Sequence, residues 1–180
     1  GGSTDYEGDF FNHNTQFSVG PFVEAQLTRD LSARAAGGYV RSDFDSTGAV
    51  AAPDSVDDFY AELSFNHQLN QYMNHQLALG REAKSGAEAE LVTLWYARYR
   101  NDWALSRVLT LHTDLFYEKG RERSGVGERL WRVGAGLGAT VPLSRKFSVS
   151  AGYQLIYKDS DQASRDYLQN LVSLQFRYAF

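Results

Sequence analysis

The stretch LQNLVSLQFRYAF, residues 168–180, shows the pattern on which the fold prediction rests. Every second residue counted back from position 180 is apolar or aromatic: Phe180, Tyr178, Phe176, Leu174 and Val172. The residues between them are small or polar. Alternation with a period of two is typical of a β-strand that has one apolar and one wet face.

The same kind of alternation recurs along most of the chain and predicts about nine strands. They are expected near residues 15–27, 31–42, 59–69, 75–80, 91–101, 109–117, 131–141, 147–158 and 168–180. Pro21 indicates a bulge or an edge in the first. The strand at 91–101 is ambiguous, because Trp95, Ala97 and Tyr99 on one face leave Val92 and Leu94 on the wet face.

Short and long connections alternate between these strands. Four short connections share one pattern of apolar and polar residues, at 27–32, 69–74, 105–110 and 143–148. Longer polar loops are expected at 43–58, 82–90, 118–129 and 158–166. Outer-membrane barrels have this asymmetry, with tight periplasmic turns and longer extracellular loops. The pattern therefore predicts an all-β fold, a transmembrane antiparallel up-and-down β-barrel over residues 15–180, preceded by an irregular lead at 1–14.

The aromatic end of the last strand resembles the terminal strand of bacterial outer-membrane β-barrels, and the hairpin pattern resembles their β-barrel porin-like families. The resemblance implies a location in the bacterial outer membrane. It also implies that Phe176, Tyr178 and Phe180 form an assembly signal, and that the partners are outer-membrane lipid, lipopolysaccharide and the assembly machinery. Single-chain bacterial barrels have even strand numbers. We therefore weigh a whole small barrel against the C-terminal part of a larger one, completed by further strands or subunits, and favour the latter.

Composition excludes several other classes of protein. The chain has no apolar run of the ~20 residues that a transmembrane helix needs. It has no cysteine, so no disulfide or thiolate metal site is expected. A net charge of −4 argues against a nucleic-acid partner. We expect no metal and no cofactor.

Charged residues on the wet face are expected to line the lumen, because a charge facing lipid at mid-bilayer costs about 2–4 kcal/mol. The predicted lumen-lining residues are Glu24, Arg34, Glu62, Arg98, Arg100, His112, Asp114, Glu118, Arg132, Lys158 and Arg177. Gly134, Gly136 and Gly138 on the same face are expected to make room for facing side chains or to ease curvature.

The function predicted from this pattern is an outer-membrane pore or an export conduit for small solutes or polymer, with a water-filled lumen. The first alternative is a plugged structural or adhesive barrel that acts through its extracellular loops. A hydrolase and a soluble β-sandwich are the others. His112 and Asp114 share a face, but no serine on that strand completes a catalytic triad, so we expect no enzymatic activity.

Overall fold

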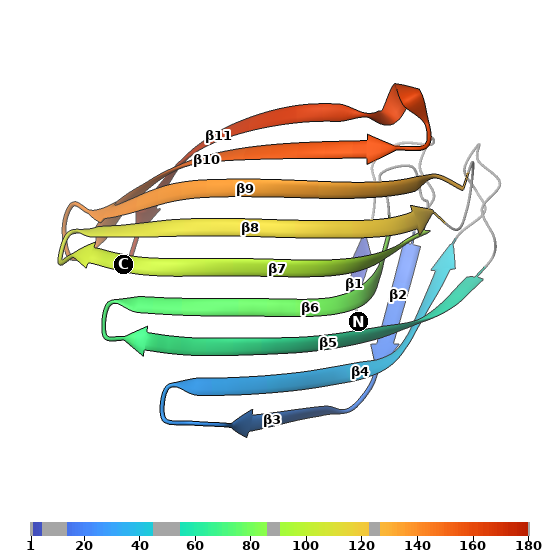
Figure 1. Cartoon of the computed structure of the whole chain (residues 1–180), viewed down its shortest axis with the longest axis horizontal. Helices are drawn as coiled ribbons and strands as arrows, with labels where there is room; N and C mark the ends of the chain where they lie inside the picture. Colours follow the sequence, from blue (N-terminus) through green and yellow to red (C-terminus); the bar gives the residue numbers. More distant parts are fainter. Residues whose placement is uncertain (1, 5–13, 45–54, 86–90, 123–126, 180) are drawn as a thin grey trace.

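The computed structural model describes residues 2–4, 14–44, 55–85, 91–122 and 127–179. In these residues the chain forms one antiparallel sheet that curves like the wall of a barrel (Figure 1). Its strands are β1 (Gly2–Thr4), β2 (Asn14–Val19), β3 (Phe22–Gln26), β4 (Leu31–Phe44), β5 (Ser55–Asn70), β6 (Met73–Ser85), β7 (Leu91–Ser106), β8 (Leu109–Glu122), β9 (Arg129–Pro142), β10 (Phe147–Ser160) and β11 (Tyr167–Tyr178).

The sheet order follows the chain from β1 to β11, with β3 beside β4, so the predicted up-and-down fold is confirmed. Within the described residues β1 and β11 stand at opposite ends of this order and do not pair. β1 lies inside the segment expected to be an irregular lead. One short 3₁₀ helix, η1 (Ala163–Arg165), precedes β11. Among the described residues no helix has the length and apolar character that a membrane crossing requires.

The first predicted strand is interrupted at Gly20 and Pro21, as the proline indicated. β2 and β3 lie on either side of the interruption, and both pair with β4. Here the Gly37 amide donates to the Pro21 carbonyl at 3.2 Å. A side chain at position 20 would meet the Gly37 carbonyl at 2.2 Å, so the interruption requires glycine.

The two faces of the sheet differ in chemistry. On the outward face, Leu137 lies opposite Tyr153, and Val133 lies opposite Tyr157. Leu137 is 61% exposed, although it is a large apolar residue in the middle of a strand. Many large apolar side chains are exposed in this way, from Phe17 on β2 to Tyr178 on β11. Such a surface is stable against lipid and not against water.

Aromatic side chains mark both ends of the outward face. Toward the long loops, the Trp131 ring lies 6.5 Å from that of Tyr117 and 5.3 Å from that of Tyr157. Toward the short turns, the rings of Phe147 and Phe176 stack at 6.1 Å. Two such girdles are typical of barrels, because these rings settle at the two headgroup levels.

The inward face packs large side chains over glycine. Phe116 lies over Gly134, where an added Cβ would approach the ring to 2.1 Å, and Tyr96 lies over Gly80. The prediction that glycine makes room for a facing side chain is confirmed at Gly134. Leu94 faces inward from β7 and is buried beside Gly120. This packing resolves the ambiguity of the strand predicted at 91–101. Leu94 lies on the inward face although it is apolar, because it fills the space over Gly120.

The strands run further toward the loops than the sequence predicted. β4 continues to Phe44 and β5 begins at Ser55, so the loop predicted at 43–58 includes residues that belong to strands. β6, β8 and β10 likewise extend past their predicted ends. The remaining loop residues 45–54, 86–90 and 123–126 lie outside the described residues. Acids at these ends misled the prediction, because several of them pair with a cation on a neighbouring strand or turn, as Glu82 does with Arg98 and Glu122 with Arg165.

One such pair lies where two neighbouring strands separate. The ladder between β5 and β6 stops at Ala61 and Arg81, although both strands continue toward the loops. Arg81 fills the gap: its guanidinium donates to the Phe59 carbonyl, lies 3.7 Å from the centre of the Phe59 ring and pairs with Asp58 at 2.7 Å. Asp58 also accepts from the Thr93 hydroxyl at 2.8 Å. A buried ion pair thus replaces the missing ladder bonds.

Candidate functional site: the charged concave face

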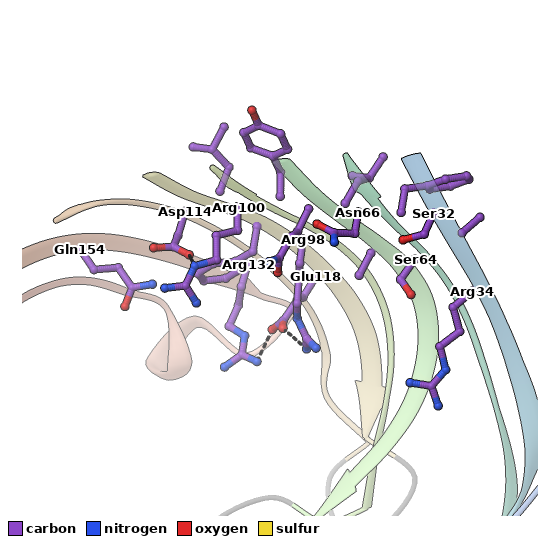
Figure 2. A pocket seen from close by; sticks show the side chains of 18 of the residues that line it. Ser32, Arg34, Ser64, Asn66, Arg98, Arg100, Asp114, Glu118, Arg132 and Gln154 are labelled. Atoms are coloured by element: carbon purple, nitrogen blue, oxygen red, sulfur yellow. Dashed lines mark hydrogen bonds and ion pairs between the residues drawn. The ribbon is translucent and has the colours of Figure 1, made fainter. Parts of the chain in front are cut away.

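The concave face of the sheet holds a hollow of about 670 Å³, lined by residues of β3 through β10 (Figure 2). Its charged lining consists of four arginines and three acids: Arg34, Arg98, Arg100, Arg132, Glu24, Asp114 and Glu118. All seven were predicted from the alternation to line a lumen. The structure brings them together because inward positions of neighbouring strands lie side by side in an antiparallel ladder.

Glu118 is the centre of a fixed ion-pair network. It is only 5% exposed, and its carboxylate lies 2.8 Å from Arg98 Nη2 and also contacts Arg132 from the next strand. Arg98 reaches a second carboxylate, Glu82, at 2.5 Å. Figure 2 shows the two arginines meeting Glu118 below the sheet. Removing one partner of such a network leaves buried charge uncompensated, so these residues hold the wall rigid.

The other charges of the hollow remain in contact with solvent. The Arg100 side chain is 52% exposed and that of Asp114 is 44% exposed, with 3.7 Å between Arg100 Nε and Asp114 Oδ1. Arg34 lies over the Phe22 ring at 4.9 Å, opposite Glu24 in the ladder. These charges are paired loosely and stay hydrated, whereas Glu118 is buried between two arginines.

Three predicted lining residues lie outside the hollow. Glu62 accepts from the Tyr96 hydroxyl at 2.7 Å. Lys158 lies at the loop end and pairs with Glu128 at 2.6 Å. Arg177 is exposed on β11, opposite Ser148 of β10. Whether any of them, or the seven of the hollow, line a water path stays a prediction.

His112 also lies outside the hollow, and its partner is not Asp114, the acid considered from the sequence. Its Nδ1 lies 2.6 Å from Asp102 Oδ1, and its Nε2 lies 2.9 Å from Thr140 Oγ1. Because a carboxylate only accepts, Nδ1 is the donor in the contact with Asp102. Asp102 was missed because it is ten residues away in sequence, although it lies opposite His112 across the β7–β8 ladder.

A second cluster, also missed from the sequence, closes the loop end around Glu128. Glu128 is 4% exposed and binds Lys158, Ser160 and Arg165, the last from η1 at 2.9 Å. Burial alone would raise the pKa of Glu128, but hydrogen bonds from these three groups outweigh it and lower the pKa to about 2. The cluster ties η1 to the end of β9.

The predicted assembly signal is only partly described. Phe176 and Tyr178 lie on the outward face of β11 and are exposed, while Phe180 lies outside the described residues. Their role as a signal stays a prediction.

Comparison with known proteins identifies the fold. No family model matches the sequence, and no curated protein does. Two solved structures of OmpT, an outer-membrane protein of Vibrio cholerae, match with TM-scores of 0.64: a loop L8 deletion mutant at 16% identity over 91% of this chain, and the in-vitro folded protein at 14% over 96%. The chain spans 53% and 62% of the length of those two proteins.

These likenesses show that the sheet has the fold of bacterial outer-membrane β-barrel proteins. The predicted fold class and resemblance are confirmed. With the exposed apolar belt and its two girdles, so is the predicted location in the bacterial outer membrane.

The same comparison corrects the expectation that the chain is not an enzyme. At 14–16% identity the OmpT structures share a fold with this chain, and one fold serves catalytic and non-catalytic proteins alike. Excluding catalysis on the missing serine of one strand was wrong, because neighbouring strands bring further residues to the same face, as Asp102 and Thr140 are brought to His112.

Proposed function

We propose that this outer-membrane barrel chain forms the wall of a water-filled pore for small polar solutes. The observation that carries the proposal is the half-exposed state of Arg100 and Asp114 inside the concave hollow. A barrel plugged by its own side chains would pair such charges fully, because each unpaired buried charge is costly. Charged side chains that are half-exposed on the inward face are stable only beside water, which a water-filled lumen provides.

The charge of the hollow favours anions weakly. Four arginines face three acids there, and Glu118 neutralises part of the charge of Arg98 and Arg132. Arg34 and Arg100 are the cations most available to a solute. Rings of charged side chains set ion preference in pores of this type.

Conductance of the refolded chain in a planar bilayer tests the proposal. We expect uniform open steps and a reversal potential in a salt gradient that indicates anion preference. Arg34→Gln with Arg100→Gln should shift that potential toward cations. Arg41→Gln is the matched control, since Arg41 is exposed outside the hollow and pairs with Asp43. A folded protein that never conducts would contradict the pore.

A silent but folded protein would instead support the alternative, a plugged structural or adhesive barrel that acts through its loops. The proposal has three further parts. The pore could carry a polymer, further strands or subunits complete the barrel, and the assembly machinery recognises the last strand. Deletion of Phe180 should lower the amount of protein in the outer membrane if the last strand is read as an assembly signal.

A further inference from the structure

The short-turn end of the barrel wall carries a set of exposed cations. All four short turns lie at one end of the sheet, on the left in Figure 1. Three of them bear cations: Arg29 between β3 and β4, Arg107 between β7 and β8, and Arg145 with Lys146 between β9 and β10. The only acid in these turns is Asp30. We call these four cations the basic rim.

The basic rim is unpaired. Within the part of the chain that the structure describes, none of its four cations has an ion pair with a carboxylate, and all four residues are exposed. The loop end is mixed: Arg81 pairs with Asp58 and Lys158 with Glu128, whereas the exposed Lys119, Arg121 and Arg129 have no ion pair either within the described residues. Exposed cations without a counter-charge favour an external anion.

Aromatic residues lie directly beside the basic rim on the lipid-facing side. Phe147 follows Lys146 in sequence and stacks on Phe176. Trp103 is exposed on the outward face of β7, near the turn that holds Arg107. Rings at this position sit at the level of the glycerol and headgroups of the periplasmic leaflet. The cations on the turns therefore lie where the phosphates of that leaflet are.

We propose that the basic rim binds the headgroups of anionic phospholipids in the periplasmic leaflet. A phosphatidylglycerol headgroup keeps the net negative charge of its phosphate, whereas the choline of phosphatidylcholine cancels it. Each Lys or Arg near an anionic surface strengthens association by roughly fivefold, and salt screens the attraction. The inference is independent of the pore, because it concerns the lipid side of the wall.

The three native tryptophans allow a direct test with an internal control. Trp103 lies at the rim end, while Trp95 and Trp131 lie on the outward face toward the loops. Replacing two of them by Phe leaves a single reporter at one end. The refolded single-tryptophan proteins are placed in phosphatidylcholine vesicles that contain brominated phosphatidylglycerol or brominated phosphatidylcholine, and quenching gives the relative association of the two lipids.

With Trp103 as reporter we expect phosphatidylglycerol to be preferred by about fivefold or more at low salt, with the preference falling as salt is added. With Trp131 as reporter the ratio of quenching by the two lipids should be the same in the native chain and in the rim variants, because none of the replaced residues lies at that end. Replacing Arg29, Arg107, Arg145 and Lys146 by Gln should abolish the preference at Trp103, and the milder pair Arg145→Gln with Lys146→Gln should lower it if the fourfold variant does not fold.

Equal quenching at Trp103 by both lipids would overturn the proposal and leave the rim to another anionic partner, such as a wall polymer or a periplasmic protein. A preference that survives in the variants would overturn it too, since the cations would then not be its source. Altered electrophoretic mobility on heating shows that each variant is folded before the lipids are compared.

Discussion

The contact between Phe116 and Gly134 shows how single residues hold this wall together. Phe116 faces inward from β8, and its ring fills the space that a side chain at position 134 would need. At Gly136, two residues along the same strand and on the same face, the nearest atom to an added Cβ is 3.6 Å away. The two glycines therefore differ in their tolerance of alanine.

Gly134→Ala should destabilise the folded barrel by about 1–3 kcal/mol, because the new methyl group forces the Phe116 ring out of place. Gly136→Ala should change the free energy of unfolding little. Urea unfolding in lipid vesicles measures both. Equal effects at the two positions would show that the Phe116 ring does not set the constraint.

Leu137 tests which face meets lipid. Leu137→Arg places a charge on the outward face at mid-strand, where it should cost about 2–4 kcal/mol in folding from urea into vesicles. Gln154→Arg is the matched control, since Gln154 lies at a similar height and lines the hollow. The control should fold almost normally. If the two arginines cost the same, the assignment of faces on β9 and β10 is wrong.

At the residue scale, the sequence showed which face each side chain takes, but not which partner it meets. A period of two gives the face directly. Partners depend on the register between strands and on side-chain reach, which a single sequence does not reveal. The sequence therefore suggested Asp114, on the same strand, as the partner of His112. The hydrogen bond to Asp102 on the neighbouring strand β7 was missed.

At the scale of the element, the separation of β5 from β6 depends on Arg81. Arg81→Ala removes a cation from Asp58, whose side chain is 3% exposed, and should cost about 3–5 kcal/mol. Hydrogen exchange should rise in the loop-side parts of β5 and β6. Arg41→Ala, at an exposed pair with Asp43, should leave exchange there unchanged. Unchanged exchange in Arg81→Ala would show that the two strand ends are held by other contacts.

The Glu128 cluster gives a pH prediction outside the membrane-spanning strands. An unfolded glutamate has a pKa of about 4.3, and the folded pKa of Glu128 is lowered to about 2. A lowered folded pKa means that the stabilisation is present above pH about 4 and is lost as the pH falls toward 2. Hydrogen exchange around η1 should therefore rise over that range.

Glu128→Gln provides the comparison for the pH prediction. It should give fast exchange around η1 already at neutral pH, with little further change on acidification. If the variant and the native chain respond to acid alike, another group controls this end of the barrel.

The loop ends were the part of the elements that the sequence predicted least well. Acids at 57, 58 and 82 look like loop residues when each is read alone, and Glu118, although predicted to face inward, stands at the start of a predicted loop. In the structure their charge is compensated across the sheet, as Glu82 and Glu118 are by Arg98. Their alternation with the preceding inward residues was the signal available in sequence. The prediction did not use this alternation at the strand ends, because polar and charged residues there were assigned to loops.

At the scale of the whole molecule, periodicity and the alternation of turns and loops were enough to predict the barrel wall. This works because lipid outside and charge inside impose opposite demands on successive residues of every strand. The hollow and its half-exposed charges could not be predicted, since they depend on curvature and register. The basic rim could be read in the turn residues, but its unpaired state becomes visible only in the structure.

The alternation of lipid and water along one strand tests the central claim most directly. Nitroxide labels at each position from 131 to 141 on β9, except Gly134 where Phe116 leaves no room, would report accessibility to oxygen, which dissolves in lipid, and to a water-soluble nickel chelate. We predict oxygen access at odd positions such as Val133 and Leu137, and nickel access at even positions such as Gly136 and Gly138. Uniform access to the nickel reagent at all positions, or the opposite alternation, would contradict a membrane barrel with a polar concave face.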